Sequence, residues 1–324
     1  MEIALVGLGG MGTVHYHNYL HMDEAHVVAL VGMGEADERR AAEWGLPLYP
    51  TVTELLKRHE VQLVDICAPT FLHKALALES LGHGKHTLTE KPAALSLSDA
   101  REMYEAAEKN GAQLYVAHVL QFSREVEVLR EVTEKRLYGE PLDASFIRLS
   151  ACPRWSHGSW LMKKEKSGLL PYDLHIHDLD VIISLFGEPK DIRYTTCGGS
   201  DKAYHEQYRF TYGFDKLHVS AEAAWLNADI PFTARWRVYY ENGALWYDGE
   251  RVTGYQRGKE PVVFDTEEAI KISTGINLPP TGWFLNELTH FVRCAEKNRP
   301  SERVPKERVL SVMKVLETIM CEEP

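Results

Sequence analysis

The chain has 324 residues, of which 44% are hydrophobic and 26% charged, a composition typical of a globular protein long enough for two domains. Its net charge of −11 argues against a nucleic-acid binder or a protein of anionic membranes, because either would need a basic face. The 5 cysteines form no CxxC pair and predict neither a disulfide framework nor a zinc site. No apolar run approaches the roughly 18 residues of a membrane helix, and no basic leader precedes the first strand, so we expect a cytoplasmic protein.

A short apolar run at residues 3–6 predicts a buried parallel strand, and a glycine motif and a helical stretch follow it directly. Gly7 permits a tight turn, Gly9 lets the backbone approach a pyrophosphate, and Gly12 allows the helix to pack closely on the strand. The free N–H groups of the helix N-terminus would bind the anion. This context favours dinucleotide binding over a simple turn. The motif comprises Gly7, Leu8, Gly9, Gly10, Met11 and Gly12.

The second predicted strand, residues 27–31, lacks the acidic residue that normally binds the adenosine ribose about 20 positions after the glycines. Gly32 stands there instead. One interpretation is that Glu35 reaches the ribose from the loop. The other is that the small residues leave room for a 2′-phosphate, which Arg39 or Arg40 would pair. The sequence therefore predicts NAD or NADP without choosing between them.

Two further strands are predicted at residues 63–67 and 86–89, and each ends in a segment suited to ligand binding. Ala68, Pro69 and Thr70 form the exit loop of the first. Glu90, Lys91 and Pro92 follow the second, and a residue before proline is pushed out of the helical region, so Lys91 should occupy a fixed, extended strand end. Ligands bind beyond the carboxyl ends of the strands in an open α/β sheet. Strands alternating with helices thus predict a doubly wound Rossmann domain over residues 1–120.

After residue 120 the pattern changes to alternating strands separated by hairpin signals, with two helical patterns at residues 283–297 and 306–321. We expect residues 121–324 to form an α+β domain with a large, mostly antiparallel open sheet. Its aromatic residues would suit either a dimer interface or the core. They are Trp225, Trp236, Tyr239 and Trp246.

A polar stripe precedes an apolar helical pattern in this second domain. Asp173, His177 and Asp180 are spaced i, i+4 and i+7 and should share one helix face, turned away from the core. Histidine exchanges protons near neutral pH, and a neighbouring carboxylate can orient it, so the stripe suits acid–base chemistry. His175 falls about 200° from His177 on a helix, which predicts a buried core histidine and disfavours a metal site.

With these motifs in this order, the chain resembles the Gfo/Idh/MocA family (glucose–fructose oxidoreductase and inositol dehydrogenase) along essentially its whole length. The resemblance implies a Rossmann domain with an open-sheet domain, NAD or NADP as cofactor, and a sugar, inositol or related polyol as substrate. Gly32, Gln121 and His175 depart from the family pattern. The residues that carry the resemblance are the glycine motif with His15 after it, Ala68-Pro69-Thr70 with His73 beyond, Glu90-Lys91-Pro92, and Asp173 with His177.

The resemblance implies that Lys91 is the catalytic lysine, that His177 transfers the proton, and that Asp173 orients His177. This agrees with alcohol oxidation, which requires removal of a hydroxyl proton and stabilisation of negative charge on oxygen. It also implies cofactor contacts from Gly7, Leu8, Gly9, Gly10, Met11, Gly12, Ala68, Pro69, Thr70, His73, Glu90 and Lys91.

We further expect substrate contacts from His118, Trp155 and Trp160, because aromatic faces suit sugar rings. The partner is a small-molecule polyol or sugar, with no metal, nucleic acid or membrane, and the chain should form a homodimer or homotetramer. Two alternatives stay open. One is a non-catalytic, nucleotide-sensing regulatory protein, and the other is an NAD-retaining glycosidase.

Overall fold

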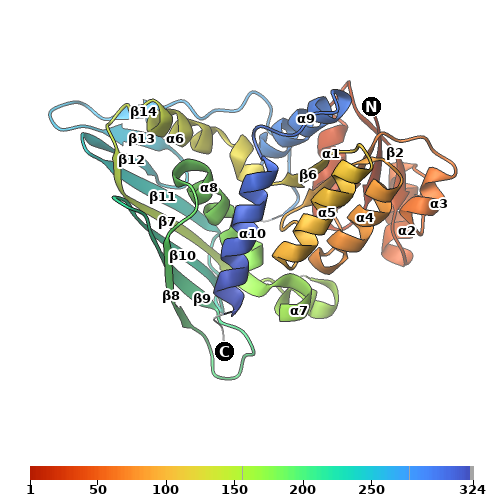
Figure 1. Ribbon diagram of the computed structural model, residues 1–324, viewed down its shortest axis with the longest axis horizontal. Coiled ribbons are helices and arrows are strands. Elements are labelled where there is room, and N and C mark those ends of the chain that lie inside the picture. Colours follow the sequence, from red (N-terminus) through yellow and green to blue (C-terminus); the bar gives the residue numbers. More distant parts are fainter. Residues whose placement is uncertain (155, 277, 322–324) are drawn as a thin grey trace. The chain divides into compact units, whose positions relative to one another are not determined.

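The computed structural model describes residues 1–154, 156–276 and 278–321, which fall into two compact units. Met1–Val119 and Ala269–Met313 form the first unit, and Leu120–Glu268 together with the chain from Lys314 onward forms the second (Figure 1). The expected assignment of all residues from 121 to 324 to one domain therefore needs a correction, because residues 269–313 pack with the first unit.

In the described part of the first unit, a 6-stranded parallel sheet has the order β3-β2-β1-β4-β5-β6. This confirms the predicted doubly wound Rossmann sheet. The direction of chain progression reverses between β1 and β4, which is the point where such sheets bind ligands. The strands are β1 (Glu2–Val6), β2 (His26–Val31), β3 (Leu48–Tyr49), β4 (Leu63–Ile66), β5 (His86–Glu90) and β6 (Leu114–Ala117). The helices are α1 (Gly10–Tyr19), α2 (Glu35–Trp44), α3 (Val52–Leu56), α4 (His73–Gly82), α5 (Leu97–Lys109) and α9 (Trp283–Glu296).

Local sequence signals account for much of this unit. The side chain of Ser96 accepts a hydrogen bond from the backbone N–H of Asp99 at 3.1 Å and starts α5, as the capping pattern predicts. Helix α9 joins the unit through apolar packing, since Phe284 lies in one cluster with Val14 and Val119.

The second unit contains an 8-stranded sheet with the order β14-β13-β12-β11-β7-β10-β9-β8 in its described part. All neighbouring strands are antiparallel except β7 and β10, which run parallel, so the mostly antiparallel prediction is confirmed. The strands are β7 (Pro141–Ala151), β8 (Asp191–Cys197), β9 (Gln207–Gly213), β10 (His218–Leu226), β11 (Thr233–Tyr240), β12 (Gly243–Tyr247), β13 (Val252–Tyr255) and β14 (Val262–Phe264). The α-helices are α6 (Arg124–Glu134), α7 (Lys164–Ser167) and α8 (Ile176–Phe186), and α10 (Lys306–Cys321) continues into this unit from the first.

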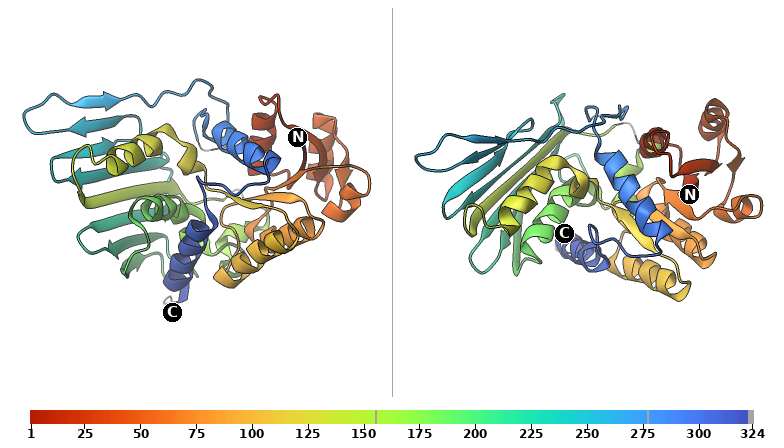
Figure 2. Two further views of the ribbon diagram at one scale, coloured as in Figure 1. Left: turned by 45° about the horizontal axis from the view of Figure 1, so that its top comes forward. Right: turned by 90° about the horizontal axis from the view of Figure 1, so that it is seen from above.

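Helices α6 and α8 lie on one face of this sheet (Figure 2). The predicted aromatic residues divide between its two faces. Trp225 and Trp236 are buried in the core, whereas Tyr239 and Trp246 are each 49% exposed. Among the described residues, no helix is both long and apolar enough to cross a membrane.

Candidate active site

The glycine motif forms the tight connection between β1 and α1. Gly7 has a φ of +85°, and a Cβ added to it would lie 2.7 Å from the backbone nitrogen of Ala68. A Cβ on Gly12 would lie 2.0 Å from the carbonyl oxygen of Gly7, so both positions require glycine. A Cβ on Gly9 would meet nothing within 4 Å, and the first turn of α1 holds no acidic residue. The loop therefore presents an open helix N-terminus, which fits a bound pyrophosphate.

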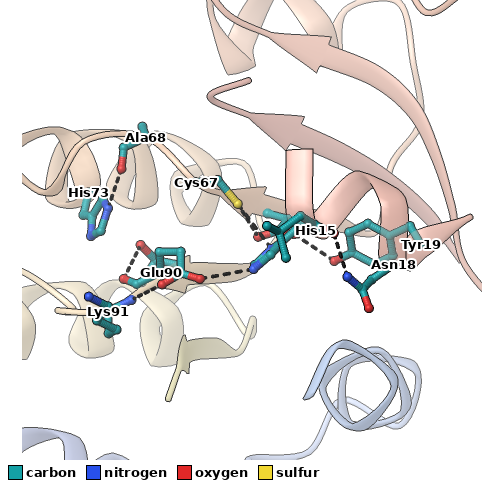
Figure 3. A network of polar contacts seen from close by, with 11 residues as sticks. His15, Asn18, Tyr19, Cys67, Ala68, His73, Glu90 and Lys91 are labelled. Atoms are coloured by element: carbon teal, nitrogen blue, oxygen red, sulfur yellow. Dashed lines mark hydrogen bonds and ion pairs between the residues drawn. The ribbon is translucent and has the colours of Figure 1, made fainter. Parts of the chain in front are cut away.

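His73 connects the segments that follow β4 and β5. Its Nδ1 lies 2.8 Å from the carbonyl oxygen of Pro92, and its Nε2 lies 2.8 Å from that of Ala68 (Figure 3). The ring can donate to both carbonyls only when it carries two protons, and burial lowers the pKa of His73, which opposes that form. Both ring nitrogens thus face protein carbonyls, and the cofactor contact of His73 stays a prediction.

Lys91 directly follows β5, as predicted, and is half-buried. Its backbone N–H donates to Glu90 Oε2 at 3.0 Å, and its peptide bond to Pro92 is cis. Glu90 itself is buried, and this hydrogen bond lets its carboxylate hold the backbone of Lys91 in place.

A buried charge network lies beneath these loops, centred on His15 of α1 (Figure 3). His15 Nδ1 lies 2.7 Å from Asp65 Oδ2, and Nε2 lies 3.2 Å from Glu90 Oε1. The Tyr19 hydroxyl also donates to Asp65 Oδ2, at 2.9 Å. One histidine of α1 thereby joins residues from β4 and β5 at the ligand-binding edge of the sheet.

The electrostatics favour the charged form of this histidine. Burial alone lowers the pKa of His15, but its interactions with Asp65 and, to a smaller extent, with Cys67 together outweigh burial and raise that pKa well above its usual value. Burial likewise opposes ionisation of Glu90, yet the bond to His15 and its charge hold the pKa of Glu90 below its ordinary value. The network therefore contains an imidazolium between two carboxylates.

The side chains of His15, Asp65 and Cys67 also form the one group in the described chain whose ligand atoms are close enough to surround a metal ion. A doubly protonated imidazole has no lone pair for a metal. Burial raises the pKa of the Cys67 thiol, which disfavours the thiolate that metals bind. The Cys67 sulfur lies 3.2 Å from His15 Nδ1, so this group is best described as a hydrogen-bonded network.

Sequence reasoning assigned no role to Asp65 and gave His15 none beyond its place in the motif. The available signal was a carboxylate inside the apolar strand residues 63–67, since a buried charge requires a partner. The identity of that partner was not accessible, because the two residues are 50 positions apart.

In the second unit, the predicted polar stripe begins on a π-helical turn at Pro171–His175 that leads into α8. Between residues 171 and 183, Asp173 and His177 are partly exposed and every other position is buried. These two side chains are thus the polar groups that this segment presents outward.

The third member of the stripe departs from prediction. Asp180 is buried, and its carboxylate accepts a hydrogen bond from the Gln121 side-chain amide. The bond to Gln121 explains how this carboxylate can be buried, because a buried charged group requires a partner. The π turn at Pro171–His175 also interrupts the regular helical spacing between Asp173 and Asp180. Asp178 is also buried and binds Arg148 of β7 through two hydrogen bonds of 3.0 and 2.8 Å.

His175 is a fully buried core histidine, as predicted. Its ring stacks on Phe210 with a centroid distance of 4.0 Å, and its Nε2 lies 2.6 Å from the Tyr212 hydroxyl. Burial, assisted by the charge of Arg148, lowers the pKa of His175 to about 3.

The three predicted substrate contacts belong to different parts of the chain. His118 follows β6 in the first unit and is buried. Trp160 is half-buried in the second unit, within the 3₁₀ segment His157–Met162. Trp155 lies outside the described residues.

Sequence models of one family match both parts of the chain. Residues 1–118 match the model described as "Oxidoreductase family, NAD-binding Rossmann fold". Residues 126–246 match the "GFO/IDH/MocA C-terminal domain". The two matches follow the structural change from the parallel sheet to the large open sheet.

Individual relatives are named for different substrates and reactions. The 2,7-anhydro-N-acetylneuraminate hydratase of Escherichia coli is 28% identical over 201 residues, which cover 62% of this chain and 53% of that protein. The myo-inositol 2-dehydrogenase of Thermotoga maritima is 29% identical over 191 residues, covering 58% of this chain and 55% of that protein. Matched regions account for 53 to 59% of the length of the first curated relatives.

Solved structures extend the likeness of fold to the whole chain. The aldose-aldose oxidoreductase from Caulobacter crescentus, complexed with glycerol, matches with a TM-score of 0.85 and 19% identity, covering 98% of this chain and 96% of that one. At this level of identity the match shows a shared fold.

Proposed function

Because the chain belongs to the Gfo/Idh/MocA family of oxidoreductases, we propose that it is an NAD(P)-dependent oxidoreductase acting on a CH–OH group of a sugar, inositol or related polyol. The observation that carries the proposal is the position of Lys91, at the carboxyl end of β5 in a dinucleotide-binding sheet. The relatives named as inositol, apiose and UDP-N-acetylglucosamine dehydrogenases support the substrate class.

We assign the cofactor to residues 7–12 and 68–70, with further contacts from His73, Glu90 and Lys91. The open space at Gly9 fits a pyrophosphate. When bound, the nicotinamide cofactor accepts or supplies a hydride. Glu90 and His73 act as positioning residues, because one holds the backbone N–H of Lys91 and the other ties together the segments after β4 and β5.

The proposed acid–base chemistry uses three side chains. The Lys91 ammonium stabilises negative charge that develops on the substrate oxygen. The His177 imidazole removes the hydroxyl proton, and Asp173 orients that imidazole and stabilises its charged form. The partial exposure of His177 and Asp173 in a buried segment supports these roles.

We also propose substrate contacts, an oligomeric state and a cellular compartment. His118, Trp155 and Trp160 are proposed substrate contacts. A homodimer or homotetramer is proposed because Tyr239 and Trp246 expose large aromatic surfaces on the open sheet. The 5 cysteines are all unpaired in the structure, which supports a reducing compartment such as the cytoplasm.

The test is the absorbance of reduced nicotinamide, followed with the purified protein, NAD or NADP, and a panel of sugars and polyols. Lys91→Ala and His177→Asn should each reduce kcat by about 10²- to 10⁴-fold with the best substrate. The exposed residues of the second unit supply matched controls, Lys216→Ala and His218→Asn, which should retain full activity. Unchanged turnover in Lys91→Ala would contradict the proposed role of this lysine.

A second candidate is a reaction that keeps its cofactor and causes no net oxidation. It is favoured by the similarity to the E. coli hydratase, because adding water to a substrate does not change its overall oxidation state. The NAD-retaining glycosidase belongs to this class. Release of sugar from an aryl glycoside, without accumulation of reduced nicotinamide, would select it over a dehydrogenase. A protein that binds cofactor tightly and turns over no substrate would instead be a nucleotide sensor.

A further inference from the structure

A carboxylate from α2 lies against the end of β2, at the position where the sequence lacks its expected acid. Strand β2 ends at Val31, and Gly32 follows without a side chain. Asp37, in the first turn of α2, folds back so that its Oδ2 accepts a hydrogen bond from the Met33 backbone N–H at 2.8 Å. A Cβ added to Gly32 would lie only 2.5 Å from this Oδ2. The Asp37 carboxylate thus occupies the space into which a side chain at Gly32 would extend.

This placement matters because the end of the second strand is where a Rossmann sheet binds the adenosine ribose. An acidic side chain there normally accepts hydrogen bonds from the ribose hydroxyls. In this chain one oxygen of Asp37 is bonded to the Met33 N–H, and no described residue donates to the other, Oδ1. A carboxylate fixed through one oxygen keeps the second available as an acceptor.

The basic residues that would favour a 2′-phosphate are engaged elsewhere. Arg40 donates to the Leu8 carbonyl at 3.0 Å and to the Thr13 hydroxyl, and its guanidinium lies 5.8 Å from the Trp44 ring centroid. Arg39 lies on the exposed face of α2, where it pairs with Glu35 at 3.4 Å. Neither arginine contacts the Asp37 carboxylate.

The charge at the start of α2 also opposes a phosphate. A helix N-terminus attracts anions, but the first turn of α2 already holds three acidic residues, Glu35, Asp37 and Glu38. A 2′-phosphate beside them would meet like charges, whereas a neutral ribose hydroxyl would find an acceptor.

We propose that Asp37 binds the ribose hydroxyls of the adenosine half of the cofactor and thereby makes the protein select NAD(H) over NADP(H). The inference rests on the proposed function, since it concerns the cofactor of that reaction. It replaces the two sequence-based interpretations, in which Glu35 or the arginines would have decided the choice.

The experiment measures the dissociation constants of NADH and NADPH by quenching of tryptophan fluorescence, so that no substrate is needed. Wild type should bind NADH at least about tenfold more tightly than NADPH, because a hydrogen bond to a charged group is at stake. Asp37→Asn should reduce that ratio about tenfold or more, by weakening NADH and strengthening NADPH. Glu38→Gln is the matched control in the same helical turn and should change the ratio less than about twofold.

A second variant moves the carboxylate without removing it. Gly32→Ala places a Cβ where Asp37 Oδ2 now lies, so Asp37 must shift, and the preference for NADH should fall as it does in Asp37→Asn. Circular dichroism of each variant verifies the fold. Equal or tighter binding of NADPH by wild type would overturn the inference, and so would an unchanged ratio in both Asp37→Asn and Gly32→Ala. Those results leave the proposed function standing, whereas binding of neither nucleotide by wild type would overturn both.

Discussion

His15 in the first unit and His175 in the second are both fully buried, and the two rings occupy opposite electrostatic environments. His15 in the first unit lies between Asp65 and Glu90, and its interaction with Asp65 helps to raise its pKa well above the usual value in spite of burial. His175 in the second unit stacks on Phe210 and bonds to a tyrosine hydroxyl, and burial lowers its pKa to about 3. Burial alone therefore does not decide the charge of a histidine. The first ring joins the charged groups of β4 and β5, and the second is a neutral part of the core.

Among the variants considered, removing a carboxylate partner from His15 should cause the largest loss of unfolding free energy. Asp65→Asn leaves a buried imidazolium with one charged partner fewer, and loss of a partner from a buried ion pair typically costs about 3–5 kcal/mol of unfolding free energy. Urea unfolding at neutral pH measures this loss of unfolding free energy. Asp191 supplies the control, because Asp191→Asn breaks only an exposed pair with Arg193 and should cost less than about 1 kcal/mol. Equal losses in the two variants would show that His15 is not charged.

Lowering the pH should destabilise the protein through His175, because this ring is neutral in the folded state. The unfolded chain binds a proton at this residue near pH 6.5, whereas the folded chain does so only near a pKa of about 3. The unfolded state therefore binds more protons between these values, and stability falls as the pH falls through that window. His175 should therefore lower the free energy of unfolding by about 2 kcal/mol when the pH falls from about 7 to about 5. His175→Phe should lack that contribution, so its unfolding free energy should depend less on pH than that of wild type.

The hydrogen bond of His175 and the packing of its ring should contribute separately to stability, and each contribution should be smaller than the effects above. At neutral pH, His175→Phe keeps an aromatic ring against Phe210 but strands the buried Tyr212 hydroxyl, which should cost about 1–2 kcal/mol. Adding Tyr212→Phe removes the stranded hydroxyl and should restore most of the loss. A double variant as unstable as the sum of the two single variants would mean that the bond makes no net contribution.

The same contrast explains what the sequence could predict. The glycine motif, the strand ends that carry Ala68 and Lys91, and the capping of α5 by Ser96 depend on residues close together in the chain, so local rules predicted them. His175 could be assigned to the core because its neighbours set its helical phase.

Features that depend on distant partners were not accessible from local patterns. The charge of His15 requires Asp65, which comes from another strand. Asp180 was wrongly placed on the outward stripe because its partner Gln121 lies 59 positions away and a π turn precedes α8. The position of Asp37 depends on a side chain that folds back over Gly32, which composition and spacing do not reveal.

The return of residues 269–313 to the first unit has a practical consequence for dissecting the protein. A recombinant fragment truncated at Val119 would lose Phe284, the partner of Val14 and Val119, and the carbonyl of Arg299 that the Tyr115 hydroxyl binds at 2.8 Å. Such a fragment should precipitate or bind hydrophobic dyes. A fragment meant to fold as the first unit would therefore have to include residues 269–313, joined to residue 119 by a designed linker.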